Sequence, residues 1–89
     1  MMTYSLNTTD KFDKQLRKLD KQTQRLILKW INKNLVDTKD PRQHGKQLVA
    51  NHKDKWRYRI GDYRMLANIQ DDKLIIIALE VGHRKDIYG

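Results

Sequence analysis

The sequence predicts an α+β domain in which a short N-terminal strand and a helical hairpin pack on an antiparallel β-meander. Two observations predict this fold class: apolar residues recur at helical spacing in the first half of the chain, and they alternate with polar residues or form an aliphatic run in the second half. Pro41, the only proline, lies in a polar stretch, 37–45, that separates the halves. A chain of 89 residues has the usual length of one domain, so a single domain is expected over residues 1–89.

The first half should contain a short strand over residues 2–6 and then two helices. The first helix has potential N-cap side chains at residues 8–10 and an apolar stripe formed by Phe12, Leu16 and Leu19. Asp20 can cap the second helix. The apolar face of that helix comprises Leu26, Ile27, Trp30, Ile31 and Leu35. Two successive helices, each with one apolar side, predict a helical hairpin.

The second half should contain three strands joined by tight turns. Apolar and basic residues alternate over residues 56–60, which is typical of a strand with one buried face. The pair Gly61-Asp62 forms a two-residue turn with glycine first, the signature of a type II′ hairpin, and residues 63–69 return as the second strand. Residues 71–72 make the next turn. Residues 73–81 are rich in β-branched and aliphatic side chains, as expected of a third strand.

The two-residue turn fixes which side chains of the first hairpin share a face. Ile60 should lie opposite Tyr63 and Arg59 opposite Arg64, and side chains alternate between faces along each strand. One face then collects the side chains that can pack on the helices: Trp56, Tyr58, Ile60, Tyr63, Met65, Ala67 and Ile69. The other face carries Arg57, Arg59 and Arg64.

Three arginines on one face form an unfavourable arrangement unless an anion lies between them. Like charges opposite each other destabilise a sheet, and a planar guanidinium binds phosphate or carboxylate in a bidentate manner. A solvated basic face is the alternative interpretation. The third strand should end near Arg64, which brings His83, Arg84 and Tyr88 toward the same face. Because Gly82 interrupts the alternation, the pattern does not decide which way His83 and Arg84 point.

This set of residues is suited to cleavage of a phosphodiester bond. Arginines stabilise charge that develops on the phosphate oxygens, histidine transfers protons near neutral pH, and tyrosine can stack on a base. Without a metal, attack by the RNA 2′-hydroxyl on the adjacent phosphate is the simplest reaction, and DNA lacks that nucleophile. His44 and His52 lie in polar stretches and are interpreted as surface residues. No metal-ligand spacing and no glycine-rich phosphate loop is present, so no metal and no cofactor is expected.

The composition points to an anionic partner. The net charge is +8, from 19 Lys and Arg residues and 11 Asp and Glu residues, and such an excess attracts nucleic acid, an anionic membrane or an acidic protein. The sequence has no cysteine, no signal-peptide pattern at its N-terminus, and no apolar run near the roughly 20 residues that cross a bilayer. A cytoplasmic protein without a membrane partner is therefore expected.

Three segments occur in a recognisable order: Gly45 to Leu48, Trp56 to Arg64, and Val81 to Tyr88. Together they resemble the RelE branch of the RelE/ParE toxin superfamily, and the resemblance extends over nearly the whole chain. It implies the RelE-like microbial RNase fold and a toxin of a type II toxin–antitoxin system. It further implies a metal-independent endoribonuclease, or mRNA interferase, that cuts mRNA in the ribosomal A site and inhibits translation. The implied partners are a RelB-like cognate antitoxin, the 70S ribosome and mRNA, with operator DNA contacted only through the antitoxin.

Residue roles follow from the resemblance where the residues match. Arg64 and Arg84 correspond to phosphate-stabilising arginines, and Tyr88 corresponds to a tyrosine that stacks on or positions an mRNA nucleotide. With Arg59 and His83 they form the expected catalytic set. The expected RNA-binding residues are Lys46, Lys53, Lys55 and Arg57.

The catalytic base and the exact activity stay open at this point. The best-known branch has two lysines where this chain has Arg57 and Arg59, and arginine is a poor general base because it stays protonated. The base is then His83, or catalysis rests mainly on charge stabilisation. The alternative functions are a ParE-like toxin that poisons DNA gyrase and a non-catalytic basic module that binds RNA or an antitoxin. The RNase is favoured by the set Arg64, His83, Arg84 and Tyr88.

Overall fold

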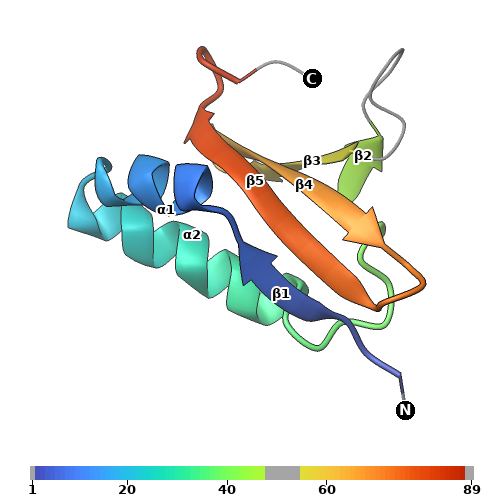
Figure 1. The fold of residues 1–89 in the computed structure, drawn as a ribbon. Helices are drawn as coiled ribbons and strands as arrows, with labels where there is room; N and C mark the ends of the chain where they lie inside the picture. Colours follow the sequence, from blue (N-terminus) through green and yellow to red (C-terminus); the bar gives the residue numbers. More distant parts are fainter. Residues whose placement is uncertain (1, 48–54, 88–89) are drawn as a thin grey trace.

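The computed structural model describes residues 2–47 and 55–87, and within these ranges two helices cover one face of a five-stranded sheet (Figure 1). The elements are β1 (Ser5–Thr8), α1 (Asp10–Arg17), α2 (Lys21–Asn34), β2 (Gly45–Gln47), β3 (Lys55–Ile60), β4 (Tyr63–Gln70) and β5 (Ile75–His83). The strand order across the sheet is β1-β5-β4-β3-β2. The predicted α+β class, with a helical hairpin between a first strand and a meander, is confirmed.

Each helix begins at a side chain that caps its N-terminus. Thr9 Oγ1 accepts a hydrogen bond from the Phe12 N–H at 3.1 Å, and an Asp20 carboxylate oxygen accepts one from the Thr23 N–H at 3.1 Å. The Thr9 hydroxyl also donates to the Leu79 carbonyl oxygen at 3.0 Å. The cap of α1 therefore fixes the start of this helix against β5.

The apolar stripes of the helices face the sheet. Phe12 of α1 and Ile27 and Ile31 of α2 are buried, and Leu35 continues the α2 stripe one turn further. Leu26 was predicted on this stripe, but it is 52% exposed. The helical step of about 100° per residue turns Leu26 away from a stripe that repeats every four residues. The stripes pack on buried side chains of the sheet: Tyr58, Ile60, Met65, Ala67, Ile69, Ile76, Ala78 and Val81.

The β3–β4 hairpin has the predicted register. Ile60 pairs with Tyr63, and Arg59 pairs with Arg64. Gly61 has a φ of 59°, and of the two turn residues it alone has a positive φ, as a type II′ turn requires. The division of the hairpin into an apolar face and a basic face is thereby confirmed.

The strand β5 contains an irregularity that decides which way its last residues point. Leu66 and Ala67 of β4 pair with Glu80 and Ala78, so Leu79 is an extra residue in β5. A bulge of this kind shifts the alternation of side chains by one position. Even-numbered residues of β5 are therefore buried before the bulge, whereas Val81 is the buried residue after it.

Two edge strands complete the sheet, and the pattern predicted neither the parallel pairing of the first nor the existence of the second. β1 begins at Ser5 instead of residue 2 and pairs in parallel with β5, so the sheet is mixed. β2 pairs antiparallel with β3 at the other edge, within and just beyond the stretch interpreted as polar. A Cβ atom at Gly45 would lie 2.9 Å from the Arg57 carbonyl oxygen and 2.9 Å from the Tyr58 ring, so glycine permits the close approach of β2 to β3.

Candidate functional site

The side of the sheet away from the helices carries basic side chains on three neighbouring strands. Arg59 of β3 is the register partner of Arg64 of β4, and Arg57 lies on the same side because it is two residues from Arg59. Lys46 of β2 is the register partner of Arg57 and joins this side. We call Lys46, Arg57, Arg59 and Arg64 the basic face.

A pocket of about 410 Å³ lies against the basic face. All four residues of the basic face line it, together with the residues that lead into β2, namely Gln43, His44 and Gly45. Among the residues that the structure describes, none that lines this pocket is acidic. We call this cavity the basic pocket, and its concave cationic wall is suited to a phosphate or carboxylate ligand.

The guanidinium of Arg64 lies at the centre of the positive charge. Burial lowers the pKa of Arg64 below its usual range, and the charges of Arg59, Arg57 and Arg84 lower it further. Arg64 Nη1 donates to the Gly61 carbonyl oxygen at 3.0 Å and to that of Tyr63 at 3.0 Å, which folds the side chain over the hairpin turn. A bound anion would relieve the repulsion among these guanidinium groups.

The basic face has no carboxylate partner of its own within residues 2–47 and 55–87. The ion pairs found there are Lys11 with Glu80 and Arg42 with Asp71, and neither involves the basic face. Asp62 is the acidic group that acts on Arg64, and its effect on the pKa of Arg64 is smaller than that of the neighbouring arginines. Within the described residues, no ion pair therefore balances the positive charge of the basic face.

The two candidate residues at the end of β5, His83 and Arg84, lie in different surroundings. The Arg84 N–H donates to the Asp62 carbonyl oxygen at 2.8 Å, so Arg84 is anchored to the hairpin turn beside Arg64. His83 is the register partner of Tyr63, and the two rings meet edge to face with centroids 5.5 Å apart. Since Tyr63 packs against the core, His83 lies on the helix side of the sheet.

A second pocket, of about 340 Å³, confirms this placement of His83. It is lined by Lys11 and Gln15 of α1 and by Lys18 just after that helix, together with Tyr63 and His83. His83 Nδ1 also accepts a hydrogen bond from the Lys85 N–H at 3.2 Å. The structure thus groups Arg59, Arg64 and Arg84, whereas His83 is separated from them by the thickness of the sheet.

The remaining predicted site residues lie at the far end of β3 or outside the described residues. Lys55 begins β3 opposite Asn68, on the same side of the sheet as Arg57. It lies at the end of the strand away from the hairpin turn. Lys53 and Tyr88 fall outside the described residues, as does His52.

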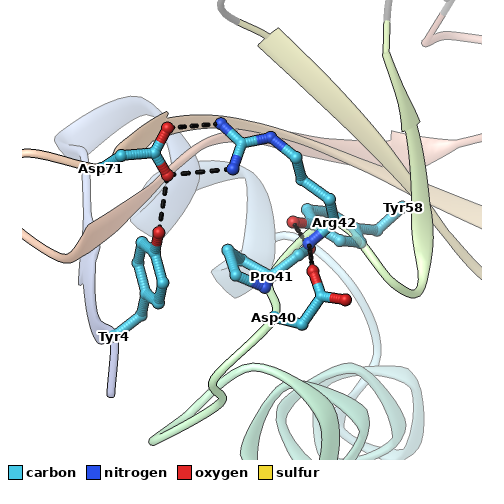
Figure 2. Close-up of polar contacts among 6 residues, drawn as sticks. All are labelled: Tyr4, Asp40, Pro41, Arg42, Tyr58 and Asp71. Carbon is cyan, nitrogen blue, oxygen red and sulfur yellow. Dashed lines mark hydrogen bonds and ion pairs between the residues drawn. The ribbon is translucent and has the colours of Figure 1, made fainter. Parts of the chain in front are cut away.

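The loop of residues 40–44, which leads into the basic pocket, is braced by contacts with distant parts of the chain (Figure 2). The Arg42 guanidinium makes two hydrogen bonds to the Asp71 carboxylate, each 2.9 Å long, and the Tyr4 hydroxyl donates to the same carboxylate at 2.6 Å. The Tyr58 hydroxyl donates to the Pro41 carbonyl oxygen. The loop is therefore tied to β3, to the segment before β1 and to the turn after β4.

The charge on Asp71 is stabilised by this arrangement. Hydrogen bonds from Arg42 and then Tyr4 lower the pKa of the Asp71 carboxyl to about 2, from its usual 3.8. The Arg42 guanidinium also lies 5.6 Å from the centroid of the Trp56 ring, within cation–π range. No local pattern in the sequence predicts this cluster, because its partners are 29 and 67 residues apart.

His44 lines the basic pocket, although the sequence pattern did not single it out as a site residue. It is exposed, as predicted for a surface residue, yet it lines the same pocket as Arg57, Arg59 and Arg64. Its ring meets the edge of Trp30 of α2 with centroids 6.3 Å apart. Its position just before Gly45 is the one feature of the sequence that links it to the segment Gly45 to Leu48 that carries part of the family resemblance.

The described part of the chain contains neither a metal-binding cluster nor a membrane-spanning helix. Within it, no three His, Cys, Asp or Glu side chains are gathered closely enough to hold a metal ion. No helix in residues 2–47 and 55–87 is long and apolar enough to cross a membrane.

Comparison with protein families gives one match over most of the chain. The family described as the ParE toxin of the type II toxin–antitoxin system parDE matches residues 6–88. Among individually curated proteins, none matches.

Solved structures of toxins have the same fold. The toxin–antitoxin complex RelBE2 from Mycobacterium tuberculosis contains a chain of 26% identity and a TM-score of 0.84, with 94% of each chain covered. The RelBE complex of E. coli gives 20% identity and a TM-score of 0.72, over 91% of this chain and 96% of the other. The RelE–RelB complex of Pyrococcus horikoshii gives 22% identity and a TM-score of 0.70, over 97% and 100%. The RelE-like fold expected from the sequence is confirmed.

Proposed function

Because the chain belongs to the ParE toxin family of type II toxin–antitoxin systems, we propose that it is a toxin that cleaves mRNA on the ribosome. The observation that carries this proposal is the basic face, where Arg59 and Arg64 face each other and Arg84 is anchored beside them. An arrangement of this kind is costly in the free protein and is relieved by a phosphate group. A linear phosphodiester backbone supplies such groups in series.

The proposed reaction is an internal transfer at phosphorus. The 2′-oxygen of one nucleotide forms a bond to the adjacent phosphorus while the bond from phosphorus to the 5′-oxygen of the next nucleotide breaks. The products are a 2′,3′-cyclic phosphate and a free 5′-hydroxyl, and the proton lost by the 2′-oxygen balances the one gained by the 5′-oxygen. Arg59, Arg64 and Arg84 would stabilise the negative charge that develops on the phosphate oxygens.

The proposed partners are those of a RelE toxin. The three solved complexes named above pair a RelE-type chain with a RelB-type antitoxin, and we propose a RelB-like antitoxin for this chain too. The proposed target is mRNA in the A site of the 70S ribosome, in the cytoplasm. Operator DNA would be contacted only through the antitoxin.

A gyrase poison is the second candidate, because the family match carries the ParE description. The two functions differ in their ligand. A gyrase poison needs a protein-binding surface, whereas the basic pocket presents guanidinium groups with no acidic residue among its described lining residues. The pocket therefore favours the RNase.

The proposal is tested with purified components. The protein is mixed with ribosomes that hold a short synthetic mRNA with an empty A site, and the RNA products are separated and their ends identified. Cleavage inside the A-site codon with a 2′,3′-cyclic phosphate is expected, and Arg64→Ala should slow it by about 100-fold or more. Intact mRNA, together with inhibition of supercoiling by purified gyrase, would replace the RNase with the gyrase poison.

A further inference from the structure

The cleavage proposed above needs an acceptor for the 2′-hydroxyl proton, and the arginines of the pocket cannot supply one. A guanidinium stays protonated over the whole physiological range and offers only donors. Lys46, the remaining member of the basic face, is exposed at the edge strand β2. The basic face can therefore bind and stabilise the phosphate, but a different group must move the proton.

Among the described histidines, His44 is the one that lines the basic pocket. It lines the basic pocket together with Arg57, Arg59 and Arg64. His83, the other described histidine, packs against Tyr63 and lines the pocket on the helix side of the sheet. The bulge at Leu79 is the cause of that separation, because it brings His83 onto the side of the buried Val81.

The surroundings of His44 hold it in place although its ring is exposed. The Trp30 ring of α2 meets it edge to face, and Trp30 is itself packed on the buried Tyr58 with ring centroids 5.7 Å apart. Two residues earlier in the chain, Arg42 is fixed by its paired hydrogen bonds to Asp71. The Gly45 N–H donates to the Arg42 carbonyl oxygen at 3.4 Å and closes the turn that contains His44.

We infer that His44 is the general base of the proposed cleavage and accepts the proton of the attacking 2′-hydroxyl. The inference rests on the proposed RNase function and adds the residue that the basic face lacks. The departing 5′-oxygen can be stabilised by the arginines and protonated by water, whereas the 2′-hydroxyl needs an acceptor beside the pocket. The charged groups that line the pocket with His44 are Lys46 of β2, Arg57 and Arg59 of β3, and Arg64 of β4.

The direct test is the pH dependence of single-turnover cleavage with saturating toxin on ribosome-bound mRNA, over roughly pH 5.5 to 8.5. The proteins compared are the natural chain, His44→Gln and His83→Gln. The His44→Gln variant should cleave about 100-fold more slowly or worse and should lose the rise in rate with pH, while its apparent affinity for ribosomes is unchanged. The His83→Gln variant should keep the rise in cleavage rate with pH.

A modified substrate separates a base from an acid. When sulfur replaces the 5′-oxygen at the cleavage site, the leaving group no longer needs a proton, so the loss of a general acid is rescued and the loss of a general base is not. The defect of His44→Gln should therefore persist on the sulfur substrate.

Three results would overturn the inference. These are an unchanged pH profile of the cleavage rate in His44→Gln, loss of the pH dependence in His83→Gln instead, or rescue of His44→Gln by the sulfur substrate. Equal circular dichroism spectra and melting midpoints for the proteins confirm that a slow variant is folded. Failure of the proposed function looks different, because the natural chain itself would then leave the mRNA intact at every pH.

Discussion

Arg59 and Arg64 are opposed across the β3–β4 hairpin, and this pairing is the residue-level feature on which the proposed activity depends. Like charges at opposing positions raise the free energy of a sheet. Burial lowers the pKa of Arg64, and repulsion from the charges of Arg59, Arg57 and Arg84 lowers it further. The guanidinium groups therefore contribute little to the stability of the free protein, and their arrangement supports the proposed phosphate site.

Removal of one of these arginines should abolish activity and leave the stability of the protein nearly unchanged. Arg64→Ala and Arg84→Ala should each abolish growth inhibition on induction, because they remove charge stabilisation worth about 100-fold or more in rate. Their melting midpoints should stay within about 5 °C of the natural protein, since surface changes of this kind alter stability little. Antitoxin binding should be largely retained.

The control for this prediction is Arg25→Ala, which removes an exposed arginine from α2 and leaves the basic face intact. It should remain fully toxic. Full toxicity of Arg64→Ala and Arg84→Ala at expression equal to that of Arg25→Ala would show that the basic face is not the active surface.

The sequence pattern predicted the position of the His83 backbone but not the direction of its side chain. Its distance along the chain from Arg64 and the strand pairing placed it near the hairpin, and this was right for the backbone. The direction of its side chain depends on one extra residue, Leu79, in β5. Nothing in an uninterrupted aliphatic run identifies which residue will be extra, because each position can pack equally well on either side.

At the scale of elements, the loop of residues 40–44 connects the helical half to the pocket. Its geometry depends on Arg42, whose guanidinium bridges to Asp71 and lies near the Trp56 ring. The loop contributes His44 to the pocket and leads directly into β2, which carries Lys46. A substitution of Asp71 should therefore alter the geometry of the pocket, although Asp71 is not among the residues that line it.

The Arg42–Asp71 pair predicts a specific dependence of stability on pH. The pKa of Asp71 is about 2 in the folded protein against a usual 3.8. Because the folded-state pKa is the lower one, the carboxylate stabilises the fold above about pH 4, and this contribution is lost as the pH falls toward 2. Asp71→Asn should lower the free energy of unfolding at neutral pH by about 1 kcal/mol, a small value because the pair is partly exposed.

Urea unfolding of the natural protein and Asp71→Asn at a series of pH values measures this difference. The two stability curves should converge as the pH approaches 2. A difference that is constant from neutral pH down to that point would mean that the carboxylate charge does not stabilise the loop.

Some elements of the fold can be predicted from the local sequence, and others cannot. The hairpin register, both helix caps and most of the apolar stripes follow from local spacing, because each depends on residues close together in the chain. The parallel pairing of β1 with β5 joins residues about seventy positions apart, and β2 has three residues with no alternation. Local patterns contain no information on such pairings, so the prediction placed a first strand without its parallel partner and missed β2.

At the scale of the whole molecule, the two sides of the sheet have different uses. The helices cover one side and enclose the core (Figure 1). The other side carries the basic face, and the net charge of the chain is +8. This division predicts that RNA contacts the uncovered side and that much of the affinity comes from phosphate contacts.

Affinity for ribosomes should therefore fall as salt concentration rises. A plot of the logarithm of the association constant against the logarithm of salt concentration should be linear with a negative slope. Arg64→Ala should reduce the magnitude of that slope by about 0.7 to 0.9, the effect of one phosphate contact, whereas Arg25→Ala should leave it unchanged. An association that does not depend on salt would contradict binding through the basic face.

The most direct test of the central claim is primer extension on a translated message after brief induction of the protein. If the basic face cleaves mRNA on the ribosome, new stops should appear within codons, should disappear when translation of that message is prevented, and should be absent with Arg84→Ala. Unchanged messages in cells that stop growing, accompanied by double-strand breaks in DNA or loss of supercoiling, would contradict the account and identify gyrase as the target.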